Sequence, residues 1–338
     1  RHWKWRMHGA AVTLSEAWNR RNEPADLLLA TDLLDLAAFR GLLQSPHRTT
    51  PLVLYFHENQ LTYPWSPGDP DPGLQRDRHY ALINYTSALA ADRIFFNSDF
   101  HRRAFLDALP EFLRRFPDHR TLHRVAEIRE KSRTLPLAIS LSELEAAPAV
   151  TPPPEEAVLL WNHRWEYDKG PEVFFRLLFR LAAEGVPFKL VVLGASYREA
   201  PPIFAQARSA LAGHLLHWGY AEDRKAYAAW LQLADILPVT SRQDFFGASV
   251  VEALYCNCYP LLPNRLAFPE HLPPALHEAH LYDGEEALYR KLVQAIRRRR
   301  QLRRGKGFRH FVERYDWRNL AGTYDRLLER ASTINPSS

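Results

Sequence analysis

Six short apolar runs recur along the second half of the chain, and their spacing limits the possible folds more than any other feature. They follow one another at intervals of roughly 20 to 30 residues, and most gaps carry apolar residues at helical spacing. Strands that alternate with helices in this way form a parallel sheet with helices on both faces. We therefore expect a doubly wound α/β domain here. The runs begin near Ala157 (AVLLW), Phe188 (FKLVVLG), His214 (HLLHWG), Asp235 (DILPV), Tyr259 (YPLLP) and His280 (HLYD).

The first half carries a second series of buried strands. Residues 27–31 (LLLAT) and 52–56 (LVLYF) are continuous in apolar residues, as parallel strands covered on both faces tend to be, and residues 93–96 continue the series. Asn97-Ser98 then provides the cap of a helix that follows directly. A chain of 338 residues exceeds what a single core usually organises, so we expect two α/β domains.

The domain boundary is predicted at residues 143–156, whose sequence is ELEAAPAVTPPPEE. Three consecutive prolines exclude a helix and favour an extended, semi-rigid connection. The two domains then comprise residues 1–142 and 157–314. The remaining residues, 315–338, begin with an amphipathic helix that we expect to cross back to the first domain.

Composition narrows the class of protein. Apolar residues make up 46% of the chain and charged residues 25%, which is typical of a globular protein. No run reaches the roughly 18 apolar residues of a membrane span and no signal peptide opens the chain, so we expect no stable membrane association. The two cysteines, Cys256 and Cys258, are too few for a zinc site and too close for an ordinary disulfide, which favours the reducing cytoplasm. The oligomeric state stays open.

Residues 235–260 carry the most informative pattern. A strand-type run is followed by a polar turn and then by helical spacing from 245 to 254. Asp244 lies just before this helix and Glu252 about two turns into it, on roughly the same face. Gly247 leaves the first turn free of a side chain, so its backbone N–H groups can face a phosphorylated ligand. Alternatively, the first acid only complements the helix dipole.

A second group of polar residues follows the strand predicted at Ala157. Arg164 and Lys169 leave its carboxyl end together, where ligands gather in open parallel sheets. Two fixed cations beside a helix N-terminus would neutralise a departing diphosphate. A sugar-nucleotide transferase needs such a phosphate clamp and also a carboxylate that binds the ribose or sugar hydroxyls, which the acids that follow the strand at Asp235 would provide.

The strand at 52–56 ends in His57, Glu58 and Asn59, at the position where a reactive group is expected in a parallel sheet. Taken alone, His57 also fits a strand-capping histidine. The nearby residues 69–71 (DPD) resemble an Asp-x-Asp metal signature, but a proline-locked surface turn explains them. We therefore expect no metal site.

Basic side chains cluster in two stretches. The balance of 44 Lys plus Arg against 39 Asp plus Glu gives a net charge of +5 and a pI near 9.2, which suits an anionic partner without requiring one. The stretches, 110–133 and 290–309, also fit the solvated face of a helix. Candidate contacts to an anionic partner within them are Arg114, Arg115, Arg120, Arg297, Arg298, Arg299 and Arg300.

These motifs resemble those of GT-B glycosyltransferases of the large retaining family four. That family carries Glu-Phe-Gly followed by a second Glu, and here the pattern stands as DFFGASVVE at 244–252. Its Arg-x4-Lys-Gly is matched by Arg164, Lys169 and Gly170, and its terminal Trp helix is similar to YDWRNLAGTYDRLL at 315–328.

Motifs of the first half narrow the resemblance to the tRNA-queuosine mannosyltransferase group. They are YFHENQLTYP (55–64), INYTSALAADRIFFNSDFH (83–101) and FPDHR (116–120), together with EALYCNCYPLLPNRLAFPEHLP (252–273). The resemblance covers nearly the whole chain. It implies a GT-B fold, in which two Rossmann-like domains face each other across a cleft, the first on the acceptor side and the second binding the nucleotide sugar.

The resemblance also implies a reaction, the retaining transfer of mannose from GDP-mannose to the cyclopentenediol of queuosine in the tRNA anticodon. The partners are then queuosine-containing tRNA and a nucleotide sugar, and the arginines of the two basic stretches become candidate contacts to RNA phosphates. A donor phosphate oxygen takes the acceptor proton on the same face of the sugar, so this scheme needs no metal and no other cofactor.

Residue roles follow from the matching positions. Arg164 and Lys169 would hold the diphosphate and stabilise the charge that develops as the C1–O bond breaks. Asp244 would bind sugar hydroxyls and His57 would contact the transferred sugar, which completes the catalytic candidates. The other predicted contacts are Glu252 to the ribose, the N–H groups of Phe246 and Gly247 to the phosphate, and Glu58 and Asn59 to the sugar or acceptor.

Two features depart from the family pattern. The first acid is Asp244 instead of Glu, and the opening strand and glycine-rich turn are expected to be missing from a sequence that starts RHWKWRMHG. Two other functions stay open. One is a family-four transferase acting on a lipid or polysaccharide, although the basic run at 290–309 lacks the apolar face of a membrane-surface helix. The other is a non-catalytic RNA-binding protein that keeps the GT-B fold.

Overall fold

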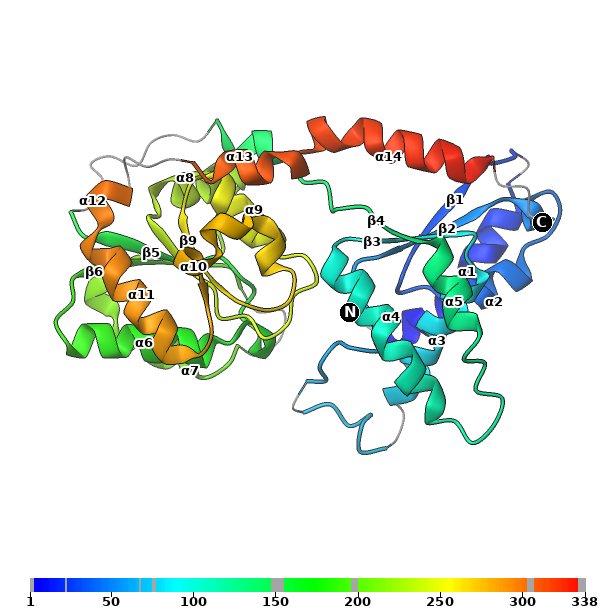
Figure 1. Ribbon diagram of the computed structural model, residues 1–338, viewed down its shortest axis with the longest axis horizontal. Helices are drawn as coiled ribbons and strands as arrows, with labels where there is room; N and C mark the ends of the chain where they lie inside the picture. Colours follow the sequence, from blue (N-terminus) through cyan, green and yellow to red (C-terminus); the bar gives the residue numbers. More distant parts are fainter. Residues whose placement is uncertain are drawn as a thin grey trace. The chain divides into compact units, whose positions relative to one another are not determined.

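The computed structural model describes residues 3–21, 23–66, 68–74, 77–146, 155–195, 200–302 and 307–333. The chain divides into two compact units, each built on its own parallel sheet (Figure 1). Arg1–Leu137 and Ala321–Ser338 belong to the first unit, and Ala138–Leu320 to the second. The second unit thus begins before the predicted linker at 143–156, of which residues 147–154 lie outside the described ranges.

The sheet of the first unit has four parallel strands in the order β1-β2-β3-β4. All of β2 is buried, because a parallel strand covered on both faces needs apolar side chains at every position. The strands are β1 (Leu28–Thr31), β2 (Leu52–Phe56), β3 (Arg93–Phe96) and β4 (Ser132–Thr134). The helices are α1 (Trp3–Asn19), α2 (Leu36–Leu42), α3 (Asp77–Ala90), α4 (Asp99–Arg114) and α5 (Arg124–Lys131), together with α14 (Trp317–Ser332) from Ala321 onward.

Each face of this sheet has its own hydrophobic cluster. On one face, Leu54 and Phe56 pack with buried side chains of α3 and α4. On the other, Val53 and Tyr55 pack with apolar side chains of α14, among them Ala331. The returning C-terminal helix is therefore part of the first unit's core.

The strands predicted at 27–31, 52–56 and 93–96 are confirmed. The predicted cap is also confirmed for Ser98, whose Oγ accepts the N–H of His101 at 3.0 Å at the start of α4. Helix α1 and strand β4 were not predicted from the sequence.

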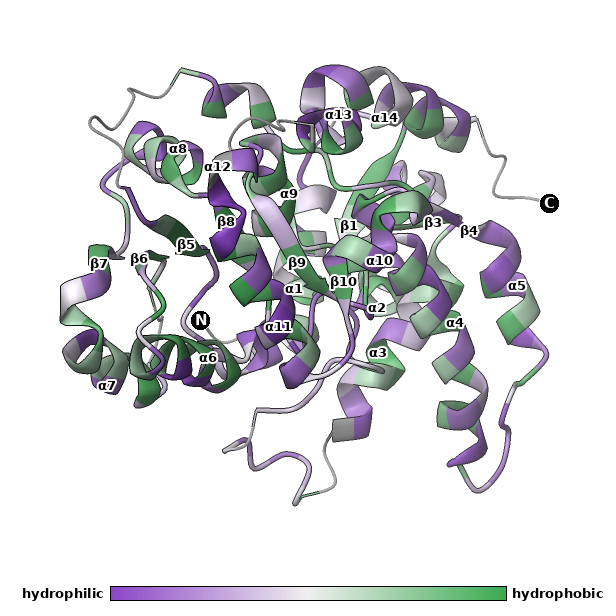
Figure 2. Ribbon diagram, turned by 60° about the vertical axis from the view of Figure 1, so that its left-hand side comes forward, coloured by the Kyte–Doolittle hydropathy of each residue, from purple (hydrophilic) through white to green (hydrophobic). Residues whose placement is uncertain are grey.

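The sheet of the second unit has six parallel strands in the order β10-β9-β8-β5-β6-β7. All six predicted runs form strands, and Figure 2 shows β5 in the green of hydrophobic residues. The strands are β5 (Ala157–Trp161), β6 (Phe188–Leu193), β7 (Leu215–Gly219), β8 (Ile236–Pro238), β9 (Tyr259–Pro263) and β10 (Leu281–Tyr282). The helices are α6 (Pro171–Ala183), α7 (Ile203–Ala210), α8 (Arg224–Leu233), α9 (Ala248–Tyr255), α10 (His277–His280), α11 (Glu285–Arg297), α12 (Arg299–Leu302) and α13 (Arg309–Val312).

Helices cover both faces of this sheet, with α8 and α9 on the opposite side from α6 and α7 (Figure 1). Leu159 and Trp161 of β5 pack with buried side chains of α6, α7 and α11. The chain leaves β5 in two directions, first through β6 and β7 and later through β8 to β10. The carboxyl ends of β5 and β8 are therefore neighbours at the point where the strand order reverses, which is where open α/β sheets bind ligands.

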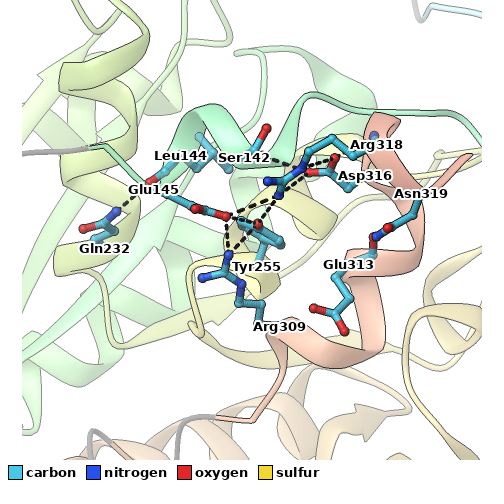
Figure 3. Close-up of polar contacts among 10 residues, drawn as sticks. All are labelled: Ser142, Leu144, Glu145, Gln232, Tyr255, Arg309, Glu313, Asp316, Arg318 and Asn319. Carbon is cyan, nitrogen blue, oxygen red and sulfur yellow. Dashed lines mark hydrogen bonds and ion pairs between the residues drawn. The ribbon is translucent and has the colours of Figure 1, made fainter. Parts of the chain in front are cut away.

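The two segments at the borders of the second unit are joined to each other by hydrogen bonds. Ile139 and Asp316 form a parallel bridge, and the Asp316 carboxylate accepts the N–H of Ser142 at 2.9 Å. Asp316 also accepts the N–H of Arg318 at 2.8 Å and so stabilises the start of α14. Ser142, near the start of the second unit, and Arg318, near its end, thus bind the same buried carboxylate of Asp316, as Figure 3 shows.

Glu145 adds a second tie between these segments (Figure 3). It accepts a hydrogen bond from the Tyr255 hydroxyl at 2.6 Å and pairs with Arg309 and Arg318. Tyr255 is the last residue of α9, so the network connects both segments to that helix. Within the described ranges, no helix is both long and apolar enough to cross a membrane.

Candidate functional site

The loops that follow β5 and β8 are joined to each other at the carboxyl edge of the sheet. The Thr240 hydroxyl donates to the backbone carbonyls of Lys169 and Gly170, at 3.0 Å each. Gly170 has a φ of 67°, and a Cβ there would lie 2.4 Å from the carbonyl oxygen of Thr240. Only glycine allows the two loops to approach this closely.

Lys169 places its ammonium group between two carboxylates. Its Nζ lies 3.1 Å from Asp168 Oδ2 and 3.1 Å from Asp244 Oδ2, and it donates to the Gln243 carbonyl at 2.9 Å. Burial would lower the pKa of Lys169, but the charges of Asp244 and Asp168 outweigh it and hold that pKa above its usual value. Lys169 is therefore a permanent cation, and the fold brings it together with Asp244.

Arg164 is the more exposed cation of the predicted clamp. Its side chain is 50% exposed, and its Nη2 lies 3.3 Å from Glu166 Oε2. An exposed ion pair of this kind contributes less than about 1 kcal/mol. The guanidinium can therefore exchange Glu166 for a phosphate group with a small loss of free energy.

Helix α9 begins at Ala248, later than the helix predicted from residue 245. The reason is Gly247, whose left-handed backbone (φ 84°, ψ 51°) separates the helix from the buried Phe246. No side chain in the described part of the chain caps this N-terminus. A helix start of this kind offers its backbone N–H groups to an anion. Glu252 lies nearer to the helix start than the predicted two turns.

Glu252 is held by two side chains of α8. The Tyr227 hydroxyl donates to its Oε2 at 2.7 Å, and Arg224 Nη2 lies 2.7 Å from its Oε1. Burial raises the pKa of Tyr227, and the charge of Glu252 raises it further, so the phenol stays a hydrogen-bond donor. Asp244 and Glu252 therefore have different partners, one on the loop after β5 and the other on α8.

His163 is buried at the end of β5 and was not predicted as a site residue. Its Nδ1 lies 2.9 Å from Ser249 Oγ in the first turn of α9, and the neighbouring Asn162 donates to the Ser249 carbonyl at 2.7 Å. Burial, followed by the charge of Lys169, lowers the pKa of His163 to about 4. The imidazole is neutral at pH 7 and connects the end of β5 to the first turn of α9.

His57 follows β2 in the first unit, as predicted, and its side chain is 47% exposed. Its backbone N–H donates to the buried Asp32 carboxylate at 2.8 Å, and its carbonyl accepts from Asn97 at 2.9 Å. Asn97 in turn contacts the buried His101 at 2.8 Å. The backbone of His57 is thus fixed on both sides, and its ring lies 3.6 Å from Asp32 Oδ1 at Nδ1 while about half of the side chain stays exposed, which suits a ligand contact better than a core role.

Glu58 and Asn59 differ in their surroundings. Glu58 is partly exposed and accepts a hydrogen bond from Gln60 at 3.0 Å. Asn59 is fully buried, and its Oδ1 accepts the backbone N–H groups of Leu61 and Thr62 at 3.0 Å each. Asn59 therefore shapes its own turn, a position that favours a structural role over the predicted contact with sugar or acceptor.

The acidic residues at 69–71 are held by Lys4. Its Nζ lies 2.6 Å from Asp69 Oδ1 and 2.5 Å from Asp71 Oδ2. Asp71 is buried and also accepts from the Tyr80 hydroxyl at 3.1 Å, so the prediction of a surface turn is wrong for this residue. The ammonium group of Lys4 therefore balances the charge of both carboxylates.

The candidate RNA contacts fall into two groups. Arg114, Arg115 and Arg120 are exposed at the end of α4 and in the loop that follows it, and Figure 2 shows purple segments on α4 and α5. The second group, Arg297 to Arg299, lines a cavity of about 360 Å³ together with Ala157, the first residue of β5. It therefore lies at the amino end of that strand, away from the loops that carry Lys169 and Asp244 at the carboxyl edge.

Within the second group, Arg299 is mostly buried and lies 3.3 Å from Asp235 Oδ2. This internal ion pair makes it less suited to RNA than the exposed Arg297 and Arg298. The side chain of Arg300, which was also predicted, lies outside the described part of the structure.

Comparisons with known proteins define the class. A family model described as glycosyl transferases group 1 matches residues 144–304. Sucrose-phosphate synthase from Thermosynechococcus elongatus has a similar structure, with a TM-score of 0.71 and 17% identity, covering 96% of this chain and 77% of that one. Anabaena HepE in complex with UDP-glucose gives a TM-score of 0.67 and 14% identity, covering 95% of this chain and 82% of that one. The predicted GT-B fold is confirmed, and the protein is a glycosyltransferase.

Two further matches identify the family. The model described as tRNA-queuosine alpha-mannosyltransferase N-terminal matches residues 1–139. A relative from Drosophila melanogaster named tRNA-queuosine alpha-mannosyltransferase is 32% identical and covers 95% of this chain, which spans 85% of the relative. The chain therefore belongs to the tRNA-queuosine alpha-mannosyltransferase family, as its sequence motifs indicated.

Proposed function

We propose that this chain transfers mannose from GDP-mannose to the cyclopentenediol of queuosine in the tRNA anticodon, with retention at the sugar C1. The observation that carries the proposal is the match to the queuosine mannosyltransferase relative over both halves of the chain. The buried cation Lys169 and the uncapped start of α9 support it. Both lie where the strand order of the sheet reverses, which is where open α/β sheets generally bind their ligands.

In the proposed reaction, the bond between C1 of mannose and the diphosphate oxygen breaks while an acceptor hydroxyl oxygen bonds to C1 from the same face. The hydroxyl proton passes to an oxygen of the departing diphosphate. Arg164, Lys169 and the start of α9 neutralise the charge on that group. Asp244 accepts hydrogen bonds from the sugar hydroxyls and Glu252 from the ribose.

Because cationic side chains and a helix start neutralise the diphosphate, the proposed scheme requires no metal ion and no other cofactor. We also place the reaction in the cytoplasm. Both cysteines are free, which is typical of proteins in a reducing compartment. Arg114, Arg115 and Arg120 are the proposed contacts to the RNA backbone, since they are exposed.

The direct test incubates the protein with radiolabelled GDP-mannose and tRNA that carries queuosine. Label is expected in the RNA, and the same tRNA with guanine at the wobble position is the matched control and should stay unlabelled. A repeat with a metal chelator should give the same rate. Failure to label queuosine tRNA, or equal labelling of both tRNAs, would contradict the proposed acceptor.

A further inference from the structure

His271 contacts the turn that precedes α9. It belongs to the short helical turn Phe268–His271 after β9 and is 1% exposed. Its Nε2 lies 2.6 Å from the carbonyl oxygen of Phe246. A carbonyl oxygen can only accept, so Nε2 carries the proton. His271 therefore donates one short hydrogen bond to the residue before Gly247.

Three rings from distant segments pack around this hydrogen bond. The Phe246 and His271 ring centroids are 5.4 Å apart at 79°, and those of Phe246 and Tyr315 are 5.1 Å apart at 79°. The rings of His271 and Tyr315 complete the set at 5.5 Å and 88°. Such edge-to-face contacts restrict the rotation of all three rings, so the imidazole of His271 is held facing the Phe246 carbonyl.

The other ring nitrogen of His271 makes this side chain a costly choice for packing alone. Its Nδ1 is buried and has no hydrogen-bond partner among the described residues. A buried polar atom without a partner destabilises the folded protein, and an apolar side chain of similar size would avoid that loss. Burial also lowers the pKa of His271 to about 4, so the ring is neutral at pH 7.

The hydrogen bond acts on Gly247 through the peptide plane. The Phe246 carbonyl and the Gly247 N–H belong to the same peptide unit and point in opposite directions within one plane. Holding the carbonyl therefore also fixes the direction of the N–H. A Cβ on Gly247 would lie 3.7 Å from His271 Nε2 and 3.1 Å from Phe268, so the turn is packed closely on this side.

We propose that His271 is a positioning residue that aims the Gly247 N–H at the diphosphate of the sugar-nucleotide donor. The proposal rests on the proposed function, because it assumes that a nucleotide diphosphate binds at the start of α9. His271 touches neither donor nor acceptor in this scheme and acts only through the Phe246 carbonyl.

The test compares two substitutions at this position. His271→Leu removes the hydrogen bond and keeps an apolar side chain, whereas His271→Gln keeps a donor that can reach the same carbonyl. GDP binding is measured by calorimetry at pH 7, and kcat and KM for GDP-mannose are measured with queuosine tRNA. We expect His271→Leu to weaken GDP binding and to raise KM about tenfold, and His271→Gln to restore both to within about threefold.

His280 provides the matched control. It is also buried in the second unit, and its Nδ1 binds a backbone carbonyl, that of Pro260, at 2.9 Å. His280→Leu should lower the melting temperature as His271→Leu does, while leaving GDP affinity unchanged. If His271→Leu loses stability but keeps its GDP affinity, or if His280→Leu loses as much affinity, the inference is wrong.

The two proposals fail in different ways. A wild-type protein that binds none of GDP, UDP and ADP overturns the donor site and the role of His271 together. A protein that binds GDP but labels no queuosine tRNA overturns only the proposed acceptor, and GDP affinity then still decides the role of His271 through the Leu and Gln variants.

Discussion

Lys169 illustrates how a buried cation can be compensated within the protein and still fit the proposed donor site. Its ammonium contacts Asp168 and Asp244, so the buried charge is balanced by two carboxylates. In the proposed reaction, the donor diphosphate offers the same ammonium a third anionic partner. Asp244 would then turn toward the sugar hydroxyls, and its single methylene limits how far it can move.

The first prediction concerns Asp244. Asp244→Asn keeps the shape of the side chain but removes the charge that strengthens its hydrogen bonds. A charged hydrogen bond made in the transition state contributes about 1.5–3 kcal/mol, so kcat should fall about 10- to 100-fold. Affinity for GDP, which lacks the sugar, should change less than about threefold. Steady-state kinetics and calorimetry check this, and an unchanged kcat would contradict the role of Asp244.

The second prediction concerns Glu252 and its partner on α8. Glu252→Ala should weaken GDP binding at least tenfold, because a charged hydrogen bond to the ribose contributes about 1.5–3 kcal/mol. Tyr227→Phe should weaken it less, since Arg224 still holds the carboxylate at 2.7 Å. Calorimetry with GDP and with the free base guanine separates the two effects. Equal affinity of wild type and Glu252→Ala for GDP would contradict the proposed contact between Glu252 of α9 and the ribose.

At the scale of elements, apolar strands were predictable and polar ones were not. The runs at β2, β5 and β8 stand out because parallel strands buried on both faces must be apolar throughout. β4 was missed because its residues, Ser132–Thr134, give no such signal. α1 was missed because its buried face is only the narrow stripe of Met7, Ala11 and Ser15, while other apolar residues of the helix, such as Trp5 and Leu14, are exposed.

The same limit applies to the candidate site. Arg164, Lys169 and Asp244 were found because a strand end and a family motif mark them. Tyr227 and His271 were not, because each acts by a hydrogen bond to a residue far away in the sequence. Only the sheet order reveals such partners.

The third prediction tests the tie between the border segments. The Asp316 side chain is 1% exposed and accepts the N–H groups of Ser142 and Arg318. Asp316→Ala removes the buried acceptor of both N–H groups, one of them at the start of α14, and should lower the free energy of unfolding by about 2 kcal/mol. Urea unfolding checks this. Glu145→Ala, in the exposed part of the same network, is the control and should cost less than about 1 kcal/mol.

At the scale of the whole molecule, buried neutral histidines set the response to acid. Burial lowers the pKa of His163 and His271 to about 4, and it also lowers the pKa values of His101 and His280. Because the unfolded chain takes up these protons near pH 6.5 and the folded chain does not, the folded state loses stability as the pH falls toward 4.

The fourth prediction follows from this difference. Between pH 6.5 and about 4, each of His163 and His271 should remove about 1.4 kcal/mol of stability per pH unit. Urea unfolding at pH 7, 6 and 5 measures the slope. His271→Gln should make the slope shallower because it removes one titrating group. A free energy of unfolding that stays constant from pH 7 to 5 would contradict the pKa values.

The fifth prediction concerns RNA binding by the whole protein. Affinity for tRNA should fall steeply with salt. Replacing Arg114, Arg115 and Arg120 with Ala should reduce the slope of log K against log salt by about 1 for each phosphate that the variant no longer binds. The double variant of Arg297 and Arg298 is the comparison, and it should change the slope less. An unchanged slope in the triple variant would contradict the proposed contacts of these three arginines with RNA.

Gly170 also decides how freely this sequence can vary. It carries no side chain and contacts no ligand in the proposed reaction, yet any Cβ at this position would meet the Thr240 carbonyl at 2.4 Å. Gly194 is constrained in the same way by the carbonyl of His163, at 2.5 Å. In a library of all single substitutions, these two positions should tolerate as few replacements as Lys169. Low tolerance at a position therefore does not by itself identify a residue that binds the donor.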